Sequence, residues 1–186
     1  IWGLMFFFQA EDSAVKFVKT LRGDASEASP AGTGKAPGDT ELCPAAIEYF
    51  NGDALELLRV QKESNAAFSH ITAVDRRFNS AVYVELHGEK EDDVVEAMGE
   101  ALERAERCGG CESDTWVAST PQLMENMKLF RHAVPEAVNL LVDQRRKENP
   151  DITKLGTDMA VPDDRLEEVM QMYKADLAEA GFDSVI

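Results

Sequence analysis

The first eight residues, Ile1–Phe8, are all apolar or glycine, and this run constrains the fold more than any other feature of the chain. A short, continuous apolar run predicts a β-strand that is covered on both of its faces. The run is far shorter than the roughly 20 residues that cross a bilayer, and it lacks the positive leader of a signal peptide. We therefore expect a buried strand in a layered protein, and no transmembrane segment.

Helical and strand-like segments alternate along the rest of the chain. Apolar residues recur at helical spacing in four segments, and two others are rich in β-branched and aromatic residues. The predicted helices cover 11–21, 91–107, a long stretch that opens at Thr120-Pro121, and a last segment that ends at Gly181; the predicted strands cover 81–86 and 115–118. Residues 45–58 contain a turn at 51–53, and the pieces on either side suit a helix or a strand. The pattern predicts an α+β fold, a ferredoxin-like layer of helices packed on a mostly antiparallel sheet.

One long segment has no periodicity. Residues 24–41 are rich in Gly, Pro, Ser and Ala, so we expect a flexible surface loop there. Within it, Gly32-Thr33-Gly34-Lys35 resembles part of a phosphate-binding loop. The full motif requires glycine and Ser/Thr where Ser29 and Ala36 stand, so we expect a plain loop.

The charge of the chain excludes some classes of partner. Nineteen Lys and Arg against 35 Asp and Glu give a net charge of −16. Nucleic acids and anionic membranes bind positive surfaces, so neither is an expected partner. With only three cysteines, a disulfide framework is not expected either. We expect a soluble, cytoplasmic protein.

A histidine and two cysteines suggest a zinc site. His87 and Glu89 precede Cys108 and Cys111 in the order found in zinc deaminases, where the metal activates a water. Arg107, however, stands where that motif has proline. The cysteines also follow a helix, and the dipole at a helix C-terminus disfavours thiolates. A zinc-dependent deaminase remains one alternative, and a non-catalytic module for small-molecule binding or oligomerisation remains another.

The long helix contains a proline beside an arginine. Pro135 has no amide hydrogen, so the carbonyl of Arg131 loses its helical partner, and we predict a kink there. An arginine presented from a distorted turn is suited to hold a carboxylate bidentately. From the residues alone, a surface arginine beside a tolerated kink is the favoured interpretation. Lys154, in the loop that follows, is a second candidate to face a ligand.

Several segments in order carry a family resemblance. An apolar opening strand is followed by AIEYF, AVYVEL, FRHAVPEAVN and TKLGTDMAVP, and then by DDRLEEVMQMYKADLAEAG. The chain thus resembles the C-terminal substrate domain of FAD-linked oxidases of the D-lactate dehydrogenase and glycolate oxidase type. The resemblance covers nearly all of residues 1–186. Its most specific part is the arginine helix followed by an Asp-x-x-Val-Pro turn.

The resemblance implies a function for the parent protein. FAD would sit mainly in a separate flavin domain of the same chain, and a small D-2-hydroxy acid would be oxidised by hydride transfer to it. Arg131 would bind the substrate carboxylate. Lys154 would be the substrate-binding lysine before the Val-Pro pair, although it lies two residues further from the proline than in other members. Pro135 stands where some members have threonine.

The resemblance also implies which parts of the parent lie elsewhere. The catalytic base and the ligands of a divalent metal would come from a Gly-His motif after Ile186. Residues 1–186 would then be a partial substrate domain, without the flavin domain and the Gly-His motif. We expect such a piece to be inactive alone.

Overall fold

The structure, a computed structural model, describes residues 1–22, 42–157 and 160–186. The loop expected over 24–41, with its Gly32-Thr33-Gly34-Lys35 segment, lies outside these residues. Within the described ranges, no helix combines the length and the apolar content needed to cross a membrane.

Four strands form one sheet in the order β2-β3-β1-β4, and all neighbouring strands are antiparallel. They are β1 (Trp2–Phe8), β2 (Ala46–Phe50), β3 (Ser80–Leu86) and β4 (Trp116–Ala118). β1 pairs with β3 from Trp2 opposite Leu86 to Phe8 opposite Ser80, and its other edge pairs with β4. The apolar run at the start of the chain is therefore a central strand, as its composition predicts.

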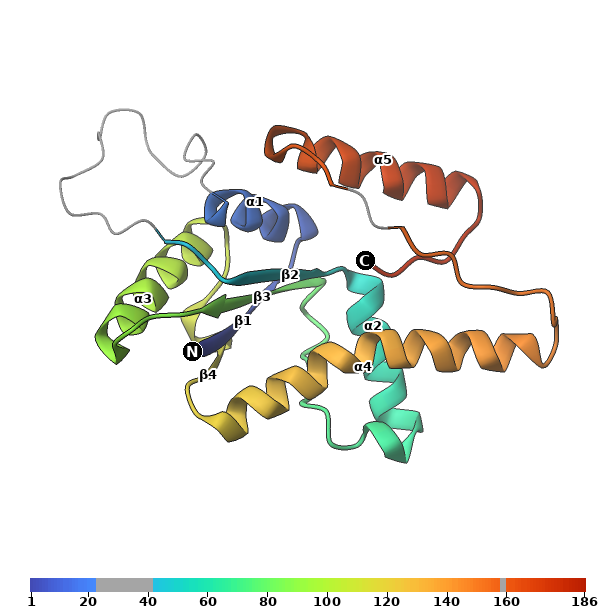
Figure 1. The fold of residues 1–186 in the computed structure, drawn as a ribbon. Helices are drawn as coiled ribbons and strands as arrows, with labels where there is room; N and C mark the ends of the chain where they lie inside the picture. The colour runs from blue at the N-terminus through green and yellow to red at the C-terminus, as the bar shows by residue number, and fades with distance from the viewer. Residues whose placement is uncertain (23–41, 158–159) are drawn as a thin grey trace.

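Helices cover both faces of this sheet. They are α1 (Glu11–Leu21), α2 (Gly52–Ser64), α3 (Glu91–Arg107), α4 (Pro121–Arg146) and α5 (Leu166–Glu179), and short 3-10 helices lie at Ala66–Phe68, Glu112–Asp114 and Asp163–Arg165. α1, α3 and α5 lie on one face, and α2 and α4 on the other (Figure 1). The strand order and the α1 and α3 crossovers confirm the predicted α+β class and its ferredoxin-like arrangement. The apolar run predicted that both faces are covered, but not that α2 and α4 form the second layer.

Alternate residues of β1 serve two separate cores. Leu4, Phe6 and Phe8 pack against α1 and α3, whereas Met5 and Phe7 pack against α2 and α4. Successive side chains of a strand point to opposite faces, so one strand supplies both cores. Each buried side chain of this size contributes about 1.5–3 kcal/mol of hydrophobic stabilisation. The two cores hold the sheet between its helical layers.

The ambiguous segment 45–58 is a strand followed directly by a helix. Asn51 is the N-cap of α2, and its side-chain Oδ1 accepts a hydrogen bond from the backbone N–H of Ala54 over 2.9 Å. Asparagine is a strong N-cap residue as well as a common turn residue. The predicted turn is thus a capping junction, which fixes where β2 ends and α2 begins.

α4 begins and continues as its sequence suggests. Thr120 caps it by accepting the N–H of Leu123 over 3.3 Å, and Pro121 follows at the first helical position. The helix runs on through Pro135 without ending, and its ribbon changes direction near its middle (Figure 1). Arg131 lies one turn before this proline.

Candidate functional site

Arg131 reaches from α4 to β2, where it holds the carboxylate of Glu48. Its Nε donates to Oε2 of Glu48 over 2.7 Å, and its Nη2 donates to Oε1. A planar guanidinium matches a carboxylate in this bidentate geometry. The sequence suggests that Arg131 is suited to bind a carboxylate in this way. In the structure, that carboxylate belongs to Glu48 of the same chain.

The neighbouring strand extends this contact. Glu48 lies opposite Tyr83 in the β2–β3 register, and the Arg131 guanidinium lies 4.1 Å from the centre of the Tyr83 ring. The Tyr83 hydroxyl donates to Oε2 of Glu85 over 2.7 Å, and Nε2 of His87 lies 2.7 Å from Oε1 of Glu85. We call these five residues the Arg131 cluster.

Hydrogen bonds and burial shift several pKa values in the Arg131 cluster. The bond to Glu48 raises the pKa of Arg131, so the guanidinium stays charged. Burial raises the pKa of the Tyr83 phenol, and its bond to Glu85 adds to this effect. The same bond lowers the pKa of Glu85, which favours the carboxylate. The cluster therefore combines one cation with two carboxylates and a neutral phenol.

The cluster is open to solvent on the Glu48 side. The side chain of Arg131 is 20% exposed, whereas those of Glu48 and His87 are 41% and 49% exposed. The Arg131–Glu48 contact therefore lies at the surface of the sheet, with the carboxylate more exposed than the guanidinium. The Glu85–His87 pair forms the exposed end of the cluster.

Sequence analysis identified Arg131 but missed its partners. Glu48 and Glu85 are the acidic residues of the otherwise apolar segments AIEYF and AVYVEL. Each lies on a strand face that also carries core residues, and each has a polar partner there. That interruption of the apolar pattern is the signal that points to the cluster.

Lys154 lies away from the Arg131 cluster. Its Nζ donates to Oδ1 of Asn139 over 2.8 Å, and the contact is exposed. Asn139 follows Arg131 by eight residues on α4, which corresponds to about 12 Å along a helix axis. The structure does not bring these two predicted site residues together.

The two cysteines of the CGGC segment lie at a helix end. Cys108 is the C-cap of α3, and the N–H of Gly110 donates to the carbonyl of Ala105 over 2.8 Å. Gly109 has a positive φ of 91°, which explains a glycine at this position. The Sγ of Cys111 lies 3.1 Å from the Ser113 hydroxyl. Across the described part of the chain, no three His, Cys, Asp or Glu side chains are grouped as metal ligands, so the structure lends no support to the zinc alternative.

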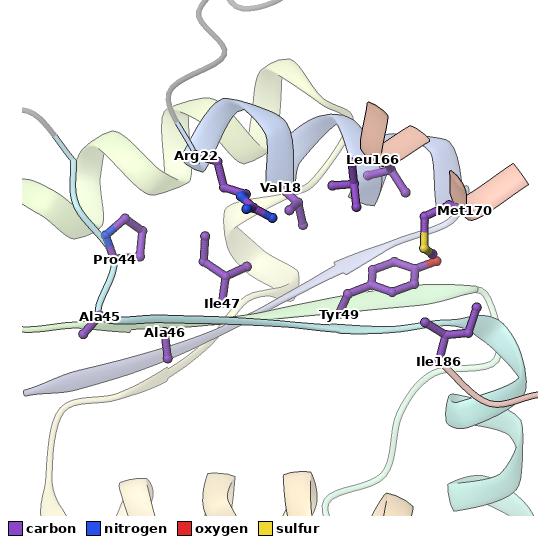
Figure 2. A pocket seen from close by; sticks show the side chains of 11 residues that line it. Val18, Arg22, Pro44, Ala45, Ala46, Ile47, Tyr49, Leu166, Met170 and Ile186 are labelled. Carbon is purple, nitrogen blue, oxygen red and sulfur yellow. The ribbon is translucent and has the colours of Figure 1, made fainter. Parts of the chain in front are cut away.

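A cavity of about 420 Å³ lies on the opposite face of the sheet, between α1, β2 and α5 (Figure 2). Its walls are mainly apolar, and they include Val15, Val18, Ile47, Leu166, Met170 and Ile186. The Tyr49 hydroxyl is buried at its floor without a hydrogen-bond partner among the described residues, and burial raises the pKa of Tyr49 to about 12. Among the described residues that line it, Arg22 is the one cation and none is a glycine.

Comparison with known proteins adds one finding. The family model described as FAD linked oxidases, C-terminal domain, matches residues 38–186. No curated protein matches the chain. The matched region contains all five residues of the Arg131 cluster, whereas β1 and α1 precede it.

Proposed function

Because the chain belongs to the family of C-terminal domains of FAD-linked oxidases, we propose that it binds the substrate carboxylate in a flavin-dependent enzyme that oxidises a D-2-hydroxy acid of the D-lactate or glycolate type. The family is one of flavin-dependent oxidoreductases, and the 2-hydroxy acid is our proposal. On this proposal, residues 1–186 are part of a substrate domain, and a flavin domain lies elsewhere in the same chain.

The observation that carries the proposal is the bidentate contact of Arg131 with a carboxylate. The guanidinium is already oriented by the Tyr83 ring and by Glu48, and it lies next to solvent. A substrate carboxylate needs this donor arrangement, and a pre-oriented arginine loses little entropy when it binds. The carboxylate of a 2-hydroxy acid is therefore the substrate group that we assign to Arg131.

The described residues do not themselves fit FAD. Among the described residues, the walls of the cavity beside Tyr49 include one cation, Arg22, and no glycine, and the Arg131 cluster carries two carboxylates that would repel phosphates. We therefore assign no residue of the described ranges to the flavin, which is consistent with a separate flavin domain. We also assign no ligand here to the divalent metal that the family resemblance implies.

Arg131→Gln in the full-length flavoprotein tests this function. Removing the charged fork leaves the substrate carboxylate unpaired, so kcat/KM for the best of D-lactate, glycolate and D-2-hydroxyglutarate should fall at least about 100-fold. Anaerobic bleaching of the flavin absorbance measures the reaction. Lys128→Gln is the matched control, because it removes an exposed cation of α4 that pairs with Glu125 instead.

Two results would overturn the proposal. Wild-type kinetics in Arg131→Gln would remove Arg131 from the substrate site. A full-length protein that is purified without flavin under cofactor-retaining conditions would remove the oxidoreductase, and would favour a non-catalytic binding module instead.

A further inference from the structure

The carboxylate subsite of Arg131 is already filled by the chain itself. Glu48 accepts from Nε and from Nη2, and these two donors form the side-on edge of the guanidinium. Of the five N–H bonds of an arginine, this leaves only those of the other edge for a second carboxylate. Arg131 has no further hydrogen-bond partner within the described ranges.

Glu48 is the movable member of this pair. Its side chain is 41% exposed, whereas that of Arg131 is 20% exposed and lies against the Tyr83 ring. Rotation of Glu48 therefore moves its carboxylate into water, whereas rotation of Arg131 would break its ring contact. Partly exposed ion pairs are weak, because water solvates the separated carboxylate well.

We infer that Glu48 is an internal competitor for Arg131, which the substrate carboxylate must displace in order to bind. The inference rests on the proposed function and adds a residue that sets substrate affinity. With the site empty, Glu48 keeps the guanidinium in its binding orientation. With substrate bound, an equivalent carboxylate takes the place of Glu48 on the same edge of Arg131.

The negative surroundings of Arg131 support displacement over simultaneous binding. Glu85 lies next to Tyr83 on the same face, and the lowered pKa of Glu85 keeps it ionised. A substrate carboxylate added beside both Glu48 and Glu85 would bring three anions to a single guanidinium. Exchange of Glu48 for the substrate keeps the number of carboxylates unchanged.

Glu48→Gln in the full-length flavoprotein tests this inference. Glutamine has the same shape and retains an acceptor, but it lacks the charge that competes with the substrate. We expect KM for the oxidised 2-hydroxy acid to fall about threefold to tenfold, with a smaller change in kcat. The dissociation constant of pyruvate, which has the carboxylate but no oxidisable C–H at its α-carbon, should fall in parallel. It is measured from the perturbation of the flavin absorbance.

Glu136→Gln is the matched control. It removes an exposed carboxylate from α4, the helix that carries Arg131, without touching Arg131 itself. KM in this control should stay at the wild-type value. An equal fall of KM in both variants would show a general charge effect and would overturn the inference. An unchanged or raised KM in Glu48→Gln would make Glu48 a structural support of Arg131, and would overturn it as well.

Failure of this inference differs from failure of the proposed function. If Arg131→Gln loses activity while Glu48→Gln keeps the wild-type KM, Arg131 binds substrate but Glu48 does not compete. If Arg131→Gln keeps activity, the proposed function fails and the competitor role fails with it. Thermal melting of each variant shows whether it is folded.

Discussion

Tyr83 is a core residue whose buried hydroxyl has a hydrogen-bond partner. The side chain is 1% exposed, and its hydroxyl donates to Glu85 at the edge of the Arg131 cluster. A buried hydroxyl without a partner costs about 1–3 kcal/mol, so this bond explains why a tyrosine is tolerated there. Because its pKa is raised, Tyr83 remains a donor throughout the neutral range.

Tyr83→Phe should therefore destabilise the domain in a pH-dependent way. The bond from Tyr83 is the largest cause of the lowered pKa of Glu85. A group with a lowered folded pKa contributes stability that is present above its unfolded pKa, about 4.3, and is lost as the pH falls through the folded value. We expect a loss of about 1 kcal/mol at pH 7 that shrinks below about pH 4, measured by urea unfolding.

Tyr49→Phe is the matched control for this prediction. Both residues are tyrosines of adjacent strands, but the Tyr49 hydroxyl is buried without a partner among the described residues. Its removal should leave stability unchanged or raise it by about 1 kcal/mol, at every pH from 3 to 8. Equal losses in the two variants would show that the Glu85 bond is not what distinguishes them.

The sequence singles out Arg131 as a candidate but does not show its environment. Pro135 marks the helix turn that presents Arg131, and such a local signal can be recognised from spacing alone. The contact with Glu48 joins residues 83 positions apart, and it depends on the register of β2 against β3. Register is a property of the folded sheet, so no local pattern shows it.

At the scale of elements, strong periodicity gave accurate boundaries. The helices predicted over 11–21 and 91–107 are those of the structure, and the strands differ from prediction by a single residue at one end. These segments have clear apolar stripes or β-branched runs. Segment 45–58 was ambiguous because Asn51-Gly52-Asp53 suits both a turn and a helix cap. Only the packing of α2 against the sheet shows that Asn51-Gly52-Asp53 is a helix cap and not a hairpin turn.

Asn51→Ala tests the junction between β2 and α2. Asn51 is 3% exposed, and its Oδ1 accepts from Ala54 and from the backbone N–H of Ile186. Loss of a cap costs about 0.5–2 kcal/mol, and this buried cap should lie at the upper end of that range. Urea unfolding measures the loss. Asn65→Ala is the control. Asn65 caps a short 3-10 helix through an exposed hydrogen bond, so its replacement should lower the free energy of unfolding by less than Asn51→Ala does.

At the scale of the whole molecule, one sheet is shared by two cores. β1 lies between β3 and β4 and supplies alternate residues to both faces, although it precedes the region matched by the family model. If the helices on either face detached, one face of the shared strands would be exposed to water. The domain should consequently unfold as a single cooperative unit.

Phe130→Ala tests this cooperativity with the two tryptophans of the chain as reporters. Phe130 is 1% exposed in the core under α4, where Trp116 packs edge-on against it with ring centres 5.3 Å apart; Trp2 packs against the other core. Removal of the ring should cost about 3–5 kcal/mol. In Trp2→Phe and Trp116→Phe backgrounds, each remaining tryptophan should report the same loss, because both cores use the same strands. A loss reported by Trp116 alone would show that the two faces unfold independently.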